Sequence, residues 1–114
     1  MKKTINNHFM KIQFNTDKTI EGHERLETFF TGELEKDLAR FEDKITRIEV
    51  HLGDENSGDK GGTNDKRCMI EARPAKLQPV AVTAYADTIE KAFFAAAEKI
   101  KKTLTTTFEK QSAY

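Results

Sequence analysis

The C-terminal stretch from Asp87 to Lys110 constrains the fold most, because its apolar residues recur at steps of three and four. This spacing places them on one face of a helix. These apolar residues are Ile89, Ala92, Phe93, Ala96, Ile100 and Leu104. Asp87 followed three residues later by Glu90 has the spacing of a capping box, with Asp87 as the N-cap. The alanines at 95–97 reduce side-chain bulk, so the pattern predicts an amphipathic helix that lies close against its partner.

The polar side of this predicted helix carries lysines. Lys91 and Lys102 fall opposite the apolar face, and Lys99 and Lys101 fall on its two flanks. One interpretation is a solvated rim around a core-packing helix, which is the ordinary arrangement. The other is that Lys99, Lys101 and Lys102 also contact an anionic partner. The spacing favours the first interpretation and leaves the second open.

Length and charge limit the classes of protein that the chain can be. A chain of 114 residues forms one domain that buries about two-thirds of its unfolded surface. Lys and Arg number 19, as do Asp and Glu, so any affinity for nucleic acid must come from a local asymmetry of charge. Cys68 is the single cysteine, which excludes an internal disulfide and favours a reducing compartment.

No segment of the chain approaches the length of a membrane span. Asn6, Asn7 and His8 stand where the apolar run of a signal peptide would be. We therefore expect a soluble, cytoplasmic protein. Residues 1–9 are predicted to be a flexible extension, and residues 10–114 a single domain.

Apolar and polar residues alternate in four segments, at 10–14, 45–52, 67–73 and 80–85, which predicts four strands. A second helix is predicted from Ile20 to Phe41. Its apolar stripe consists of Leu26, Phe29, Phe30, Leu34, Leu38 and Phe41. The order strand, helix, three strands, helix predicts an α+β fold in two layers, a four-stranded sheet with both helices on one face.

The hydrophobic core follows from these faces. We expect the helices to pack on the sheet through Met10, Ile12, Phe14, Leu26, Phe30, Ile48, Val50, Ile70, Val80, Val82, Phe93, Ile100 and Leu104.

The charges are distributed unevenly. Residues 21–43 hold eight carboxylates against Arg25, Lys36 and Arg40, a net charge of minus five. The open face of the predicted sheet would instead gather cations around Met69 and Tyr85, namely Lys11, Arg47, Arg67 and Arg73. Scattered cations of this kind neutralise phosphates without reading bases. A solvated surface has much the same composition.

No constellation of residues indicates catalysis. His8, His23 and His51 share no metal-ligand spacing, and neither a nucleophile elbow nor a P-loop is present. The loop at 54–65 resembles a calcium loop weakly, since its glycine is fifth rather than sixth and its twelfth residue is Asp65. A hairpin connection is the simpler interpretation. We expect no enzyme, no metal, no cofactor and no small-molecule substrate.

Four segments together carry a family resemblance. They are residues 10–16 (MKIQFNT), 38–52 (LARFEDKITRIEVHL), 66–74 (KRCMIEARP), and 86–90 (ADTIE) leading to 97–102 (AEKIKK). In combination they resemble the ribosome hibernation-promoting factor family, also called the sigma-54 modulation or ribosome-associated inhibitor family. The resemblance runs from Met10 to about Thr107 and matches the short form, without the C-terminal dimerisation domain of the long form. It places the family start at Met10.

The resemblance implies a fold similar to double-stranded-RNA-binding domains. It also implies a non-enzymatic factor that binds small-subunit rRNA in the channel for mRNA and tRNA and silences translation under stress or in stationary phase. The cations implied to grip rRNA phosphates are Arg25, Lys36, Arg40, Lys91, Lys99, Lys101 and Lys102. The first helix is acidic, however, and residues 105–110 are not basic as the family pattern expects. The alternative is a stress-related protein-interaction module on the same fold, without RNA contact.

Overall fold

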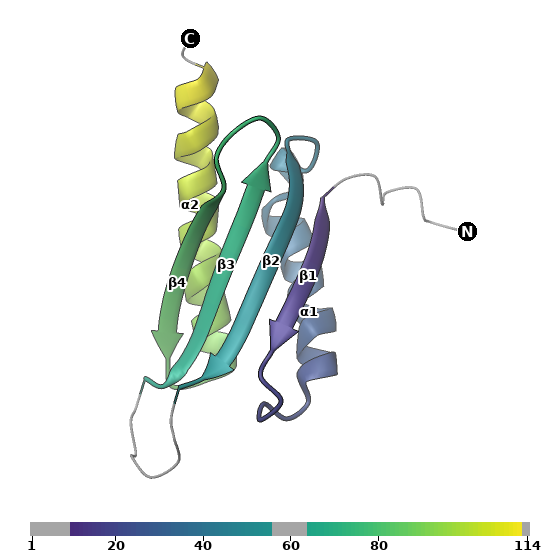
Figure 1. Ribbon diagram of the computed structural model, residues 1–114, viewed down its shortest axis with the longest axis vertical. Coiled ribbons are helices and arrows are strands. Elements are labelled where there is room, and N and C mark those ends of the chain that lie inside the picture. The colour runs from purple at the N-terminus through teal and green to yellow at the C-terminus, as the bar shows by residue number, and fades with distance from the viewer. Residues whose placement is uncertain (1–9, 56–63, 113–114) are drawn as a thin grey trace, which may run out of the picture.

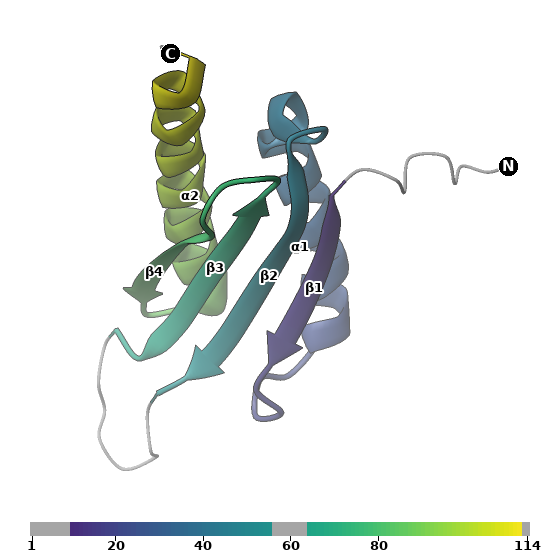
Figure 2. The same ribbon diagram turned by 45° about the horizontal axis from the view of Figure 1, so that its top comes forward.

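The computed structural model describes residues 10–55 and 64–112. Its elements are β1 (Lys11–Thr16), α1 (His23–Asp37), the 3-10 helix η2 (Ala39–Phe41), β2 (Ile45–Asp54), β3 (Lys66–Pro74), β4 (Val80–Ala86) and α2 (Ile89–Ser112). Figures 1 and 2 show both helices on one face of a single sheet, with α1 behind β1 and α2 behind β3 and β4. The predicted α+β order and the two-layer arrangement are confirmed. The extension predicted at 1–9 lies outside the described residues.

The four strands form a mixed sheet in the order β1-β2-β3-β4. β1 and β2 are parallel, whereas β2 pairs antiparallel with β3, and β3 pairs antiparallel with β4. Parallel neighbours need a crossover that returns the chain to the starting end, and α1 supplies it. The antiparallel pairs need only short connections and no crossover helix. The second helix, α2, therefore follows β4 and packs on the same face of the sheet as α1 (Figures 1 and 2).

Side chains alternate between the two faces of the sheet. In β2, Ile48, Val50 and Leu52 are buried under the helices, while the residues between them are on the open face. A register shift between Ile45 and Arg47 interrupts the alternation. Ile45 can therefore be buried as well, although it is three residues before Ile48.

The core lies between the sheet and the helices and is centred on two stacked rings. Phe30 of α1 and Phe93 of α2 have ring centroids 3.9 Å apart, and both side chains are fully buried. The predicted core is confirmed at Phe30, Ile48, Val50, Ile70, Phe93, Ile100 and Leu104, which are buried. The other six predicted core residues are partly buried and pack against it: Met10, Ile12, Phe14, Leu26, Val80 and Val82.

The prediction for the first helix was wrong at both ends and in one residue of its stripe. The helix begins at His23 rather than Ile20, because Gly22 has a φ of 67°, a left-handed conformation that glycine adopts readily. It ends at Asp37, and residues 39–41 form a separate 3-10 turn. Phe29 was assigned to the apolar stripe, but 48% of it is exposed. Neighbouring residues on a helix point about 100° apart, and because Phe30 is fully buried against Phe93, Phe29 lies at the edge of the core.

The start of α2 also differs from the prediction, by one residue. The N-cap is Thr88, whose Oγ1 accepts a hydrogen bond from the backbone N–H of Lys91 at 3.1 Å. Asp87 instead forms an ion pair with the Lys91 ammonium at 3.2 Å. With Thr88 as the cap, the third helical position is Lys91 and not Glu90, so no capping box forms. Ala96 and Ala97 are buried as expected, but Ala95 is exposed.

Candidate nucleic-acid interface

The basic residues of the acidic first helix share one side of it. Arg25 and Lys36 are four residues before and seven residues after Phe29, which places all three on one helical stripe. The Phe29 ring meets the ring of Phe94 in α2 edge-on, with centroids 6.1 Å apart. Just beyond the helix, Arg40 donates a long hydrogen bond of 3.5 Å to the Oγ1 of Thr105 in α2. The cations of the first helical segment therefore face α2.

A matching stripe runs along α2. Phe94, Lys101 and Thr105 are seven and four residues apart, so they share the side of α2 that meets Phe29 and Arg40. Phe94 is 42% exposed and Phe29 48% exposed, so the two rings are accessible between the helices. We call the combined surface the inter-helix face: Arg25, Phe29, Lys36, Arg40, Phe94, Lys101 and Thr105.

Much of the acidity of α1 lies on the other side of the helix. Glu27 accepts a hydrogen bond of 2.6 Å from the hydroxyl of Thr16 in β1. Glu24, three residues before it, and Glu35, eight residues after it, lie on the same side of the helix. Glu33 is the exception, because it forms an ion pair of 3.5 Å with Lys36. On α2, Glu98 follows Phe94 by one turn and adds a second carboxylate beside the inter-helix face. The net charge of minus five is therefore a poor guide to the charge that α1 turns toward α2.

The structure does not bring all seven predicted cations together. Arg25, Lys36, Arg40 and Lys101 share the inter-helix face, but three others lie elsewhere on α2. Lys99 donates a hydrogen bond of 2.7 Å to the carbonyl of Thr83 in β4, on the opposite flank of the helix. Lys91 pairs with Asp87, and Lys102 is exposed one residue beyond Lys101, about 100° around the helix. The seven residues form one group of four and three separate positions.

One cation that sequence reasoning omitted lies beside the first group. Lys44 lines a hollow of ≈ 320 Å³ together with Arg40, Phe41, Thr105, Phe108 and Glu109. Lys44 stands in the short link between η2 and β2, outside any periodic element. A spacing of four residues from Arg40 places two side chains together only within one helix, so the sequence carried no usable signal for Lys44.

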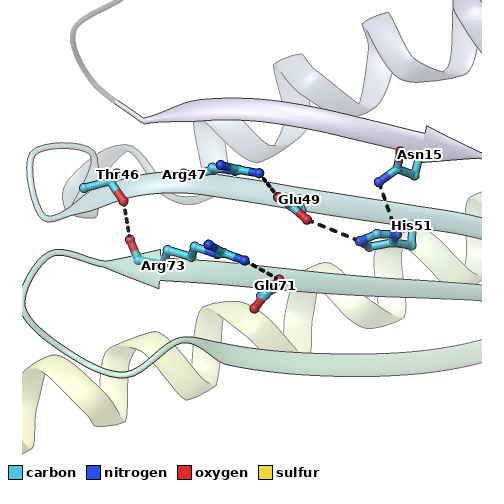
Figure 3. A network of polar contacts seen from close by, with 7 residues as sticks. All are labelled: Asn15, Thr46, Arg47, Glu49, His51, Glu71 and Arg73. Atoms are coloured by element: carbon cyan, nitrogen blue, oxygen red, sulfur yellow. Dashed lines mark hydrogen bonds and ion pairs between the residues drawn. The ribbon is translucent and has the colours of Figure 1, made fainter.

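The open face of the sheet carries cations as predicted, but two of its arginines form ion pairs with glutamates two residues away on the same strand (Figure 3). Arg47 forms an ion pair with Glu49, and Arg73 pairs with Glu71 at 3.7 Å. The hydrogen bond from Arg47 lowers the pKa of the Glu49 carboxyl below its ordinary value. His51 lies 3.5 Å from the same carboxylate. These pairs run along the strands and reduce the charge that the sheet face can offer to a ligand.

The other end of this face is also unsuited to phosphate. Arg67 is directly across from Tyr85 in the strand register, and Tyr85 is 53% exposed. The Arg67 guanidinium is paired with Glu55 at 2.9 Å. A hollow of ≈ 360 Å³ at this end is lined by Asp17, Asp54 and Glu55 among others, and these carboxylates repel nucleic acid.

Metal ligation and thiol chemistry have no support in the residues that the structure describes. Among them, no cluster of three or more His, Cys, Asp or Glu side chains is placed to hold a metal ion. Cys68 is fully buried, and burial raises the pKa of its thiol to about 12, which leaves it protonated at neutral pH. No helix in the described part of the chain has the length and apolar character needed to cross a membrane.

Comparison with known proteins adds to this geometry. A family model described as "Sigma 54 modulation protein / S30EA ribosomal protein" matches residues 12–112. Among solved structures, the chain is similar to one titled "Structure of an ribosomal subunit interface protein from Coxiella burnetii", with a TM-score of 0.60 and 14% identity. That match covers 88% of this chain and 97% of the other. It shows a shared fold. None of the curated proteins compared matches the chain.

Proposed function

The chain belongs to the sigma 54 modulation protein / S30EA ribosomal protein family, and from this we propose that it is a ribosome hibernation factor. In this proposal it binds small-subunit rRNA in the channel used by mRNA and tRNA, and so silences translation under stress or in stationary phase. It works in the cytoplasm, without catalysis and without a cofactor, by occupying the channel.

The inter-helix face is the observation that carries the RNA-binding part of the proposal. Four cations converge there from α1, η2 and α2, although the chain as a whole has no net charge. Cations spread along a surface neutralise the phosphates of a nucleic acid backbone, which needs no particular base sequence. The exposed rings of Phe29 and Phe94 add two flat surfaces on which unpaired bases can stack.

The remaining predicted cations have smaller parts in the proposal. Lys99 is held against the β4 backbone and Lys91 against Asp87, so each must break an existing contact before it can bind a phosphate. Lys102 is exposed and lies between the side of α2 that faces α1 and the flank that carries Lys99. We infer that all three add long-range attraction, with fewer direct phosphate contacts than the inter-helix face makes.

Sedimentation with separated ribosomal subunits tests the proposal. The protein is expected to pellet with small subunits, to remain in solution with large subunits, and to be displaced when the small subunits are first loaded with mRNA and tRNA. It is also expected to inhibit translation of a reporter mRNA in a cell-free system. A folded protein that pellets with neither subunit contradicts the proposal and favours the interaction module without RNA contact. Binding to loaded and empty small subunits alike would exclude the channel as the site.

A further inference from the structure

The hollow beside Lys44 lies where the end of the first helical segment meets the last turns of α2. Figure 1 places the C-terminal end of α2 and the turn leading into β2 at the same end of the molecule. The hollow of ≈ 320 Å³ is lined by Arg40, Phe41, Lys44, Thr105, Phe108 and Glu109. Two cations from one segment and one carboxylate from α2 therefore border this space.

Two aromatic rings hold the cations in place. Phe41 and Phe108 are buried, with ring centroids 5.1 Å apart. The Arg40 guanidinium lies 4.7 Å from the centroid of Phe41, and the Lys44 ammonium lies 5.3 Å from that of Phe108. A cation over a ring face at these distances is attracted by the quadrupole of the ring. The rings restrict both side chains to the rim of the hollow.

Hydrogen bonds anchor the same cations to the rest of the fold. The Lys44 backbone N–H donates to the carbonyl of Phe41 at 2.8 Å, and the Lys44 carbonyl accepts from the N–H of Ala75 at 2.9 Å. The Thr105 hydroxyl donates to the Lys101 carbonyl at 2.8 Å, and this orients the oxygen that Arg40 contacts. The backbone of Lys44 and the side chain of Arg40 are therefore already held in place, which reduces the entropy that a ligand must remove.

The charges select the kind of anion. Arg40 and Lys44 provide two positive charges, and Glu109 provides one negative charge at the same hollow. The balance of one positive charge complements a phosphodiester, which carries a single negative charge. A phosphate dianion would bring a second negative charge close to Glu109, and like charges at short range oppose binding.

We propose that this hollow binds one phosphodiester group, with Arg40 and Lys44 as its ligands and Glu109 as the group that disfavours phosphate dianions. This inference rests on the proposed function for the identity of the natural ligand, which is then one phosphate of the rRNA backbone. It adds Lys44 to the cations that contact RNA, and it gives Phe41, Phe108 and Thr105 the role of positioning those cations.

The first experiment is an NMR titration of the folded protein with the dinucleotide UpU, which contains one phosphodiester, and separately with inorganic phosphate. UpU is expected to shift the backbone amides of Lys44, Thr105 and Glu109 in a saturable way, and inorganic phosphate to bind severalfold more weakly. Lys44→Ala should abolish the shifts, and Lys44→Arg should retain them. Glu109→Gln should tighten UpU binding severalfold and tighten inorganic phosphate binding by more. Lys18→Ala, an exposed lysine in the turn after β1, is the matched control and should change neither.

Equal affinity for UpU and inorganic phosphate would overturn the choice of a diester. Unchanged UpU binding in both Lys44→Ala and Glu109→Gln would overturn the site itself. Glu109→Gln is expected to leave the fold intact, so a change in its affinity for UpU reports on the site and not on folding.

The second experiment separates this site from the proposed function. In ribosome binding across a salt series, Lys44→Ala should reduce the slope of log affinity against log salt by about 0.7, the value of one single-strand phosphate contact, while binding persists. If the parent binds small subunits and Lys44→Ala keeps the parental slope, the hollow does not contact rRNA, although the proposed function stands. If UpU binds the hollow as described but the parent does not bind ribosomes, the diester site stands and the proposed function fails.

Discussion

The two helices lie on the same face of the sheet but contribute differently to the molecule. Among its side chains described by the structure, from 89 to 111, α2 buries eight, namely Ile89, Ala92, Phe93, Ala96, Ala97, Ile100, Leu104 and Phe108. α1 buries two of its 15, Phe30 and Leu34. The three buried alanines bring the backbone of α2 close to the sheet. Most of the helical contribution to the core thus comes from α2, which leaves the surface of α1 free to carry charge.

The difference explains how an acidic helix can take part in a basic surface. A helix with few core anchors has most of its circumference exposed, so its charges can be sorted by side. On α1, Glu24, Glu27 and Glu35 lie on the side away from α2, and Arg25 and Lys36 lie on the stripe of Phe29, which contacts α2. The net charge of α1 does not reveal this separation of charges by side. The separation matters because α2 lies beside the basic side, so that cations of both helices share one surface.

The largest expected effect comes from the ring at the centre of the α2 interface. Phe93→Ala should reduce the free energy of unfolding by about 3–5 kcal/mol, because it removes a fully buried ring stacked on Phe30. Phe29→Ala is the matched control on α1 and should cost less than about 1 kcal/mol, because nearly half of Phe29 is exposed. Urea unfolding of both variants measures the difference. Similar losses in the two would show that α1 anchors the core as much as α2 does.

A smaller effect is expected at the start of α2. Thr88→Ala should cost about 1 kcal/mol, because it removes the hydroxyl that accepts the N–H of Lys91. Asp87→Ala should cost less, since it removes an exposed ion pair with Lys91. Thermal unfolding of the two variants ranks them. A larger loss for Asp87→Ala would restore Asp87 as the cap that the sequence pattern indicated.

The smallest effect at neutral pH concerns Cys68, which lies on β3 beneath the helices. Its thiol has a pKa of about 12 in the folded protein, above the value of roughly 8.5 for an unfolded thiol. The folded state therefore gains from this group below about pH 8.5, and the gain is lost as the pH rises toward 12. Alkylation by iodoacetamide at pH 8 should be slow in the parent and in Phe29→Ala, and faster in Phe93→Ala. Rapid alkylation of the parent would mean that the thiol is not covered.

The sequence predicted the regular elements well because burial imposes period 2 on strands and a period near 3.6 on helices. It failed where two neighbours compete for one position. Periodicity admits either Phe29 or Phe30 to the core, and the stack on Phe93 decides between them. The cap of α2 moved from Asp87 to Thr88 for a similar reason, since both side chains can accept a backbone hydrogen bond.

The candidate site was less predictable than the fold. Whether Lys99 and Lys101 share a surface depends on which elements flank α2, and β4 holds Lys99 through the Thr83 carbonyl. Lys44 lies in a link with no periodic pattern, and its position over Phe108 depends on a contact between residues 64 positions apart in the chain. The resemblance to a family indicated that basic residues of the two helices bind the partner. Which of these residues share a surface depends on how α1 packs against α2.

The most direct test of the account compares two triple variants that lose the same charge. One variant replaces Arg25, Lys36 and Lys101 with Ala, and so removes three cations from the inter-helix face. The other replaces Lys91, Lys99 and Lys102 with Ala, and so removes three cations from elsewhere on α2. Binding to small ribosomal subunits is measured across a salt series, after circular dichroism shows that both variants are folded. The first variant is expected to bind more weakly, with a salt slope lower by about 2, because each lost phosphate contact is worth about 0.7–0.9. The second should lose less affinity and keep a salt slope nearer to that of the parent, because its three cations make fewer direct phosphate contacts. Equal losses in the two variants would contradict the inter-helix face as the RNA-binding surface.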